Sequence, residues 1–371
     1  MPDVLIYADT LRSPELRHEL PLSIPDPILY LERNGSRHVV SGSLELPRLR
    51  ELGGVEVHAL EDYGWDELVA QGLEREQIQL EVATRAIREL GIVRASVPGG
   101  FPLEVADHLR SNGIELAPEN GLFKRRRRAK NAHELAGIRR AQKAAEAGME
   151  AARSFLRRAR DEGKTVTSEE VKREIDEQFI AHGCAADEFI VSHGPQSAIG
   201  HHMGEGPIDR GEPIVIDVWP RDRESGCYAD MTRTFVIGEP SEELRTWHGL
   251  VKEALDRALT ETRAGVVGRT LYDGSCEIFE REGYNTQRTK EPGRPLEDGF
   301  FHSLGHGVGL EVHEDPGLGL TSRDELIPGD VVTLEPGLYR SGVGGCRLED
   351  LVVVTKDGNE NLTDFPYELE V

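Results

Sequence analysis

One stretch near the C-terminus constrains this chain more than any other: residues 302–313, with the sequence His-Ser-Leu-Gly-His-Gly-Val-Gly-Leu-Glu-Val-His. It contains three histidines, His302, His306 and His313, and the second lies within a Gly-His-Gly-Val-Gly core. Such a segment is costly as pure structure, because glycine loses chain entropy on folding and histidine contributes little apolar burial. Neutral imidazoles are common ligands of transition metals, and glycines let the backbone approach a bound group closely. The stretch therefore indicates a binding or catalytic segment.

Two carboxylates follow this stretch on apolar segments. Residues 331–334, Val-Val-Thr-Leu, predict a strand that carries Glu335 into a Pro-Gly turn. Residues 345–354 predict a strand that enters the core with Arg347 and Glu349 on one face, because side chains along a strand alternate with period two. A carboxylate beside a buried sheet needs a cation or hydrogen-bond donors. Both acids are therefore candidate ligands.

A predicted hairpin upstream supplies two more acids. Residues 213–219 form a strand of buried type that contains Asp217, and residues 226–237 form a second strand that contains Asp230. The charged segment 220–225 between them, with a proline at its start and a glycine after it, is typical of a hairpin loop. In an antiparallel hairpin, both acids can face the same side.

Together these residues have a chemical logic. Four carboxylates within a few ångströms would repel one another until some became protonated, unless positive charge lies among them. Two divalent cations supply that charge. Oxygen ligands with a single imidazole suit Mn²⁺, which we expect as the metal, and also Co²⁺, Zn²⁺ or Fe²⁺. Two metals about 3.5–4 Å apart can stabilise both the nucleophile and the developing oxyanion of a hydrolysis. The predicted ligands are Asp217, Asp230, His306, Glu335 and Glu349.

The motifs around these ligands resemble a known family. They are Ala-Asp-Met-Thr-Arg-Thr at 229–234, Gly-His-Gly-Val-Gly at 305–309, Leu-Glu-Pro-Gly at 334–337 and Arg-Leu-Glu-Asp at 347–350. In this order they resemble the pita-bread metallopeptidases over roughly residues 130–371. The three histidines of the opening stretch, together with Arg347, are similar to the proline-specific branch, which comprises Xaa-Pro aminopeptidase (aminopeptidase P) and Xaa-Pro dipeptidase (prolidase).

The resemblance implies a role for each ligand. Asp217 would chelate one metal, and Asp230 and Glu349 would bridge both. His306 and Glu335 would complete the second metal. The reaction would be hydrolysis of the Xaa-Pro bond by a hydroxide that bridges the two metals.

The resemblance also implies roles beyond metal binding. Glu335 would shuttle the proton of the attacking water, and His313 and His201 would stabilise the tetrahedral intermediate. His302 and Arg347 would bind the substrate, a peptide with proline in its second position.

The same residues leave other functions open. A methionine aminopeptidase-like hydrolase and a non-catalytic pita-bread interaction module are the alternatives. Within the proline-specific branch, the residues do not decide between an aminopeptidase and a dipeptidase.

The chain departs from the family pattern in three places. Asp217 and Asp230 lie thirteen residues apart rather than the usual eleven. Because the side-chain period is two, this longer loop keeps both acids on the same face. Trp219 stands where the family generally has glycine, which affects the substrate size that the pocket admits. The usual Pro-His becomes Gly200-His201-His202, and counting favours His201, with His202 as the alternative.

The fold class predicted is α+β, with a C-terminal pita-bread domain and a smaller N-terminal α/β domain. The domains expected are a creatinase-like α/β domain at 1–122, a basic linker at 123–131 and the catalytic domain at 132–371. In the first domain we predict strands at 28–32, 38–40, 55–59, 92–97 and 114–116, and helices at 44–51, 65–72, 79–90 and 102–112. The Asn-Gly pair at 34–35 predicts a hairpin between the first two of these strands. In the second we predict helices at 132–160, 168–182, 241–263 and 268–282, and Thr167-Ser-Glu-Glu170 is a capping box at the start of the second.

Composition narrows the partners. The net charge of −23 argues against nucleic acid and anionic membranes as partners, although the run Lys-Arg-Arg-Arg-Arg at 124–128 is basic. We expect no membrane span, because the sequence has no stretch of about eighteen apolar residues. The four cysteines show no paired spacing, so we expect neither disulfides nor a zinc cluster. We expect a cytoplasmic protein, and the family resemblance implies a homodimer.

Overall fold

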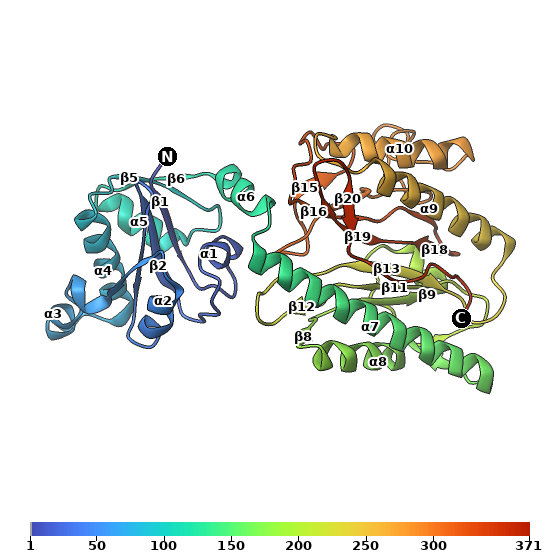
Figure 1. The fold of residues 1–371 in the computed structure, drawn as a ribbon, viewed down its shortest axis with the longest axis horizontal. Coiled ribbons are helices and arrows are strands. Elements are labelled where there is room, and N and C mark those ends of the chain that lie inside the picture. The colour runs from blue at the N-terminus through green and yellow to red at the C-terminus, as the bar shows by residue number, and fades with distance from the viewer. Residues whose placement is uncertain (1) are drawn as a thin grey trace. The chain divides into compact units, whose positions relative to one another are not determined.

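The computed structural model describes residues 2–371, and the chain separates into two compact units. Unit 1 is 1–127 and unit 2 is 128–371. The division falls inside the basic segment 123–131 that we expected to link two domains. Figure 1 shows a sheet with surrounding helices in unit 1, and strands between two pairs of long helices in unit 2.

Unit 1 is built on one six-stranded sheet with the order β4-β3-β2-β1-β5-β6. Its strands are β1 (Val4–Ala8), β2 (Ile28–Arg33), β3 (Ser36–Ser41), β4 (Glu56–Ala59), β5 (Arg94–Val97) and β6 (Glu115–Pro118). Strand β2 pairs antiparallel with both of its neighbours, β1 and β3. The remaining pairs, β1–β5, β3–β4 and β5–β6, are parallel. The hairpin predicted at its Asn-Gly turn is confirmed as β2–β3.

Helices cover both faces of this sheet. They are α1 (Pro14–Glu19), α2 (Leu46–Leu52), α3 (Trp65–Ala70), α4 (Arg75–Glu89), α5 (Leu103–Ser111) and α6 (Asn120–Arg128), with a short 3₁₀ helix at Leu60–Tyr63. One apolar cluster packs α3, α4 and α5 against one face, and a second packs α1, α2 and α6 against the other. All the helices and strands predicted for this domain are present.

Four elements of unit 1 were not predicted: strand β1, helices α1 and α6, and the 3₁₀ helix. No strand was expected at 4–8, although β1 lies inside the sheet, between β2 and β5. The basic run forms part of α6 instead of an extended linker. Its arginines pair with acids within their own units: Arg126 contacts Glu19 and Glu32 at 2.8 Å in unit 1, and Arg128, the first residue of unit 2, contacts Asp330 at 2.6 Å. Because these side chains are fixed in ion pairs and Phe123 is buried, the segment becomes helical.

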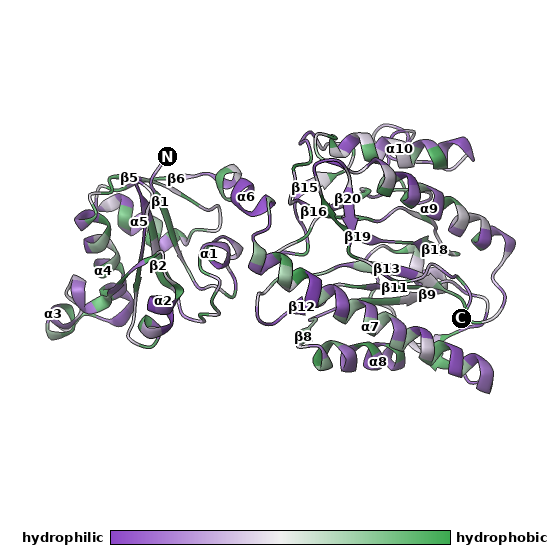
Figure 2. Cartoon of the chain, viewed as in Figure 1, coloured by the Kyte–Doolittle hydropathy of each residue, from purple (hydrophilic) through white to green (hydrophobic). Residues whose placement is uncertain are grey.

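Unit 2 contains four long helices. These are α7 (Ala132–Glu162), α8 (Ser168–Ala181), α9 (Glu242–Glu261) and α10 (Gly268–Arg281). The predicted capping box at Thr167 is confirmed, because its hydroxyl accepts a hydrogen bond from Glu170 N and the Glu170 carboxylate accepts one from Thr167 N. Figure 2 shows hydrophilic and hydrophobic stretches alternating along these helices, as expected when one side of each helix is buried.

The strands of unit 2 form several small sheets. They are β7 (Val166–Thr167), β8 (Cys184–Ala185), β9 (Ile190–His193), β10 (Pro207–Ile208), β11 (Ile214–Val218), β12 (Arg221–Asp222), β13 (Met231–Phe235), β14 (Gly305–Gly307), β15 (Glu314–Leu318), β16 (Val331–Leu334), β17 (Gly337–Arg340), β18 (Gly344–Arg347), β19 (Asp350–Val354) and β20 (Asn359–Asn361), with a 3₁₀ helix at Gly194–Ala198. The two largest sheets have the orders β13-β11-β9 and β15-β14-β16-β19-β20.

Two apolar cores hold these strands between the helices. One core packs α7 and α8 against β11 and β13, and it includes Val331 and Val353. The other packs α9 and α10 against the opposite side, and it includes Val332 and Val352. Strands β16 and β19 are thus buried on both faces, which explains why most of their residues are apolar.

The single strand predicted at 345–354 is divided in the structure. β18 ends at Arg347 and pairs with β17, whereas β19 begins at Asp350 and pairs with β16. Between them, the Glu349 N–H donates to the Thr232 carbonyl at 3.0 Å. The prediction was wrong here because the chain changes partner strand at 348–349, and alternation along a sequence does not reveal such a change.

Within residues 2–371, no helix is both long enough and apolar enough to cross a membrane.

Candidate metal centre

The two acids of the predicted hairpin lie on one face. In the antiparallel pair β11–β13, Asp217 lies opposite Thr232. Asp230 precedes Thr232 by two residues, so alternation brings it to the same side as Asp217. Strand β13 begins at Met231, so Asp230 lies just before the strand and not within it.

The remaining predicted ligands come from the five-stranded sheet and the segment after β18. His306 lies in β14, and its Nε2 is 3.4 Å from Glu335 Oε1 and 3.8 Å from Asp230 Oδ2. Glu335 follows β16 directly, and its N–H donates to the Leu304 carbonyl at 2.7 Å. Ligand atoms of Asp230, His306 and Glu349 all lie within 4.8 Å of one another.

The glycines beside His306 serve strand packing. A Cβ added at Gly305 would overlap the Thr333 carbonyl of β16, and one at Gly307 would overlap the Asp315 carbonyl of β15. Because β14 is held between these two strands, only glycine fits on either side of the histidine. The sequence pattern indicated close approach of a ligand at these glycines, and the structure gives this different reason for them.

The carboxylates perturb one another strongly. Burial, followed by the charges of Glu349 and Asp217, raises the pKa of Asp230 well above its ordinary value. Burial and the charges of Glu335 and Asp217 do the same to the pKa of Glu349. Burial raises the pKa of Glu335 to about 8, although Arg347 acts in the opposite direction. In the protein alone, these acids favour their neutral forms.

Two observations test whether cations fit this cluster. Within the described part of the chain, Asp217 Oδ1 and Asp230 Oδ1 are buried and have no hydrogen-bond partner. Burial also lowers the pKa of His306 to about 4, so its imidazole is neutral and able to act as a ligand. Buried carboxylate oxygens without donors, next to a neutral imidazole, form a donor set that suits divalent cations. The residues therefore fit metal ions.

Arg347 is the cation that lies closest to these acids in the structure. Its Nη2 is 2.5 Å from Asp217 Oδ2, and its Nη1 donates to the Tyr339 hydroxyl at 2.8 Å. Its Nε lies 3.3 Å from Thr232 Oγ1, which in turn donates to Glu349 Oε2 at 2.6 Å. Arg347 and Glu349 thus converge on one hydroxyl, even though they do not share a strand.

Tyr339 and Thr232 belong to the site but were not predicted from the sequence. The Tyr339 hydroxyl also lies 2.9 Å from His302 Nε2, so it connects His302 with Arg347. A signal for Thr232 was available, since it is two residues from Asp230 and must share its face. For Tyr339 no local signal was available, because its partners meet it through the β17–β18 pairing and the segment before β14.

The other predicted histidines surround the same cluster. The rings of His306 and His313 have centroids 4.3 Å apart in a T-shaped arrangement. Burial, Arg347 and His201 together lower the pKa of His302 to about 3. The pKa of His313 is lowered first by burial and then by His201. His201 therefore lies close to both, whereas Nδ1 of His202, the alternative, accepts a hydrogen bond from Gly204 N.

Trp219 follows β11 and is half-buried. Its indole packs against the core beneath α7 and α8. It directly follows the strand that carries Asp217, so it is close in sequence to the cluster, and its indole is held by apolar contacts.

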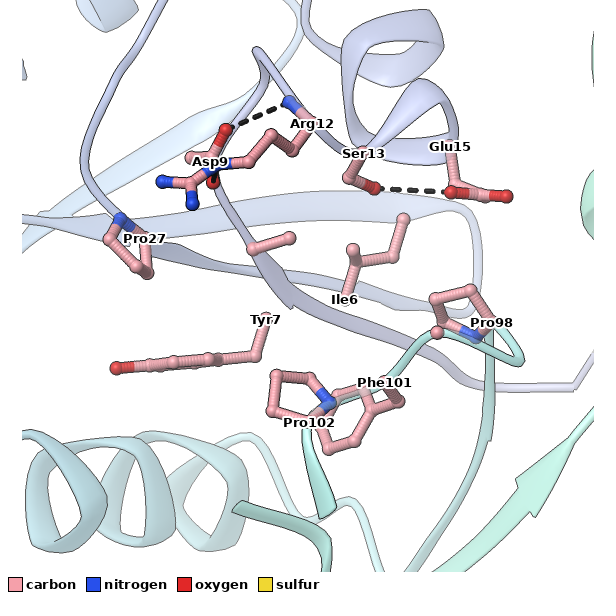
Figure 3. Close-up of a pocket in the computed structure, with 12 residues that line it drawn as sticks. Ile6, Tyr7, Asp9, Arg12, Ser13, Glu15, Pro27, Pro98, Phe101 and Pro102 are labelled. Carbon is pink, nitrogen blue, oxygen red and sulfur yellow. Dashed lines mark hydrogen bonds and ion pairs between the residues drawn. The ribbon is translucent and has the colours of Figure 1, made fainter. Parts of the chain in front are cut away.

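A separate cavity of about 310 Å³ lies in unit 1 (Figure 3). Its wall includes Tyr7, Phe101 and Pro102. Its polar residues bind each other: Arg12 Nε lies 3.0 Å from Asp9 Oδ2, and the Ser13 hydroxyl donates to Glu15 at 3.2 Å. Because these groups already have partners, the cavity does not add to the candidate site.

Comparison with known proteins gives a consistent result. Residues 136–356 match metallopeptidase family M24. A Xaa-Pro dipeptidase of Pyrococcus horikoshii is 31% identical over 290 residues, which cover 77% of this chain and 76% of that protein. The solved structure of a Xaa-Pro dipeptidase from Bacillus anthracis matches with a TM-score of 0.82 at 27% identity, covering 100% of this chain and 95% of its own. The solved structure of an X-Pro aminopeptidase from Thermotoga maritima matches with a TM-score of 0.81 at 25% identity, and the match covers 100% of this chain and 98% of that one.

Proposed function

Because this chain belongs to metallopeptidase family M24, we propose that it hydrolyses the Xaa-Pro bond of peptides whose second residue is proline, either at the N-terminus of a longer chain or in a dipeptide. Its α+β pita-bread fold, expected from the sequence, is that of the similar structures. Both a dipeptidase and an aminopeptidase are among these relatives, so the length of the substrate stays open between them.

One observation carries this proposal: acids from separate segments of the chain converge around a neutral imidazole, and two of their buried oxygens have no hydrogen-bond partner among residues 2–371. Such a cluster repels itself unless cations bind to it. We propose that Asp217, Asp230, His306, Glu335 and Glu349 hold two divalent ions, with Mn²⁺ preferred over Co²⁺, Zn²⁺ and Fe²⁺ because most donors are hard oxygens. When bound, such ions lower the pKa of water and stabilise developing negative charge.

The residues of the chain would then divide the remaining work. Glu335 would accept and return the proton of the attacking water, because its carboxylate lies beside His306 among the groups that would hold the ions. His302 and Arg347 would bind the substrate on its proline side, and the Tyr339 hydroxyl would hold both in position. His313 and His201 would donate hydrogen bonds to the oxygen that gains charge in the tetrahedral intermediate.

Two finer expectations also remain proposals. We propose that the protein works as a homodimer, which analytical ultracentrifugation would test. We also propose a cytoplasmic location; its four cysteines are buried and unpaired, which is compatible with a reducing compartment. Cell fractionation would test that location.

The deciding experiment is an assay of an Xaa-Pro dipeptide and an Xaa-Pro-Yaa tripeptide with the purified protein, after chelation and after addition of Mn²⁺, Co²⁺ or Zn²⁺. Metal-dependent cleavage of either substrate supports the proposal, and the ratio of the two kcat/KM values assigns it as dipeptidase or aminopeptidase.

Two other results would contradict it. Cleavage of Met-peptides alone would favour a methionine aminopeptidase-like hydrolase. Failure to bind any metal would favour a non-catalytic interaction module.

A further inference from the structure

A second group of potential metal ligands lies in unit 1. His38 is on β3, and Glu56 and His58 are on the neighbouring edge strand β4. These strands pair in parallel, with His38 opposite Glu56 and with His58 two residues further along β4. Alternation therefore places all three side chains on one face of the sheet.

The distances in this group match those around a tetrahedral ion. Nδ1 of His38 is 3.2 Å from Nε2 of His58 and 3.4 Å from Oε2 of Glu56. With bonds of about 2.0–2.1 Å and tetrahedral angles, two ligand atoms on one Zn²⁺ ion lie about 3.3–3.4 Å apart. All three potential ligand atoms lie within 4.8 Å of one another.

Hydrogen bonds alone do not give each of these three atoms a suitable partner. Nδ1 of His38 carries at most one proton, yet it faces both a carboxylate oxygen and a second ring nitrogen. If it donates to Glu56, His58 must share that proton. If it accepts from His58, its lone pair faces the carboxylate. A cation at the centre meets all three lone pairs at once.

The surroundings hold the ligands in place. His38 is only 7% exposed, and its ring lies 5.4 Å from that of His58, centroid to centroid. The ring of Tyr63 lies 5.8 Å from His58 on centroids. Burial also lowers the pKa of His38, which favours the neutral ring that can act as a ligand. Glu56, by contrast, is largely exposed, so an ion could enter from solvent.

We propose that His38, Glu56 and His58 bind one divalent transition-metal ion, with Zn²⁺ as the best match, at a site separate from the peptidase centre. Two imidazoles and one carboxylate are a known zinc donor set, and they leave the fourth position to water or an anion. The ion fastens the edge strand β4 to β3, because it joins side chains from both.

The test counts zinc in the full chain without using peptidase activity. Asp230→Asn with Glu349→Gln removes two ligands of the centre in unit 2, and this background is stripped with chelator, equilibrated with Zn²⁺ and desalted before elemental analysis. We expect one Zn²⁺ per chain to remain. Adding His58→Ala should remove it. His108→Ala is the matched control, since His108 lies in the same unit, 3.7 Å from one carboxylate, Glu81, and belongs to neither metal-type group among residues 2–371.

The outcomes separate clearly. Absence of zinc in the background would mean a hydrogen-bonded triad only and would overturn the proposal. Retention of zinc after His58→Ala, or equal loss in the His108→Ala control, would overturn it as well. If His58→Ala does not fold by circular dichroism, Glu56→Gln on the exposed edge should weaken Zn²⁺ binding at least about tenfold. Unchanged binding in that variant would again contradict the site.

Discussion

The two clusters of potential metal ligands, one in each unit, differ in charge and in how far apart in the sequence their residues lie. The centre in unit 2 gathers four carboxylates and one imidazole from segments spread over 217–349, and two of these residues, Asp230 and Glu349, are buried. The cluster in unit 1 has two imidazoles and one carboxylate from adjacent parallel strands, within 38–58. The first is strongly self-repulsive as protein alone, whereas the second carries about one negative charge and can persist through hydrogen bonds.

This contrast predicts different dependence on metal. Burial of the acids of unit 2 raises their pKa values, so their arrangement needs cations or protons. The unit 1 cluster can remain folded without a metal ion, through hydrogen bonds of its own side chains. Metal removal should therefore lower the stability of unit 2 far more than that of unit 1. Substitution of the unit 2 acids should leave the zinc of unit 1 bound.

The largest effect should follow Glu335→Gln. Loss of the proposed proton carrier, together with weaker metal binding, should lower kcat by about 10²–10⁴-fold. Steady-state kinetics on an Xaa-Pro dipeptide with saturating Mn²⁺ measures it. Glu297→Gln, at an exposed acid, is the control and should retain full activity. Normal turnover by the Glu335→Gln enzyme would contradict the proposed role of Glu335 in proton transfer. The zinc held by unit 1 should be unaffected in this variant.

Stability without metal should fall as pH rises. The folded-state pKa of Glu335 is about 8, above the ordinary value of 4.5, and those of Asp230 and Glu349 are also raised. Their stabilising contribution is fully present below about pH 4.5 and is lost as the pH rises through about 8, a change on the order of a few kcal/mol. The melting temperature of chelated protein should thus be lower at pH 8 than at pH 5, and Mn²⁺ should raise it more at pH 8.

The control for this pH effect is Asp230→Asn with Glu349→Gln, which removes two of the raised carboxyls. The difference between pH 5 and pH 8 should shrink in this variant. An unchanged difference would assign the effect to other groups, such as the overall negative charge of the chain.

Tyr339→Phe should have an intermediate effect. Removing the hydroxyl leaves Arg347 Nη1 without the acceptor at 2.8 Å and frees His302, at a cost of about 1–3 kcal/mol for a buried charged donor. We expect kcat/KM to fall about 5–100-fold, mainly through KM, since the proposed role is to position substrate-binding residues. Tyr228→Phe, at a half-buried tyrosine, is the matched control. A loss confined to kcat would argue against positioning.

The smallest effect should come from Trp219→Gly. Removal of the indole beside the end of β11 should raise kcat/KM for a tripeptide relative to a dipeptide, by about tenfold or less, the scale of one apolar contact. The two substrates are compared in parallel assays. If the ratio does not change, Trp219 does not limit substrate length.

Much of the fold could be predicted from local pattern. Long periodic segments and a capping box predicted helices α7 and α8, and an Asn-Gly turn predicted the β2–β3 hairpin. Strand β1 was missed because periodicity alone does not identify a run of only five apolar residues as a strand. The division at 348–349 was missed because it depends on which strand each residue meets.

The sequence by itself determined the kinds of ligand and the face on which several of them lie. Residue types and period-two alternation are local properties, so the sequence alone assigns Asp217 and Asp230 to one side of their hairpin. Only the tertiary structure decided that Tyr339 joins His302 to Arg347, and that His38 meets Glu56 and His58. These contacts depend on strand pairing between distant segments, and the free energy that selects a pairing comes from the packed core rather than from the residues that the pairing brings together.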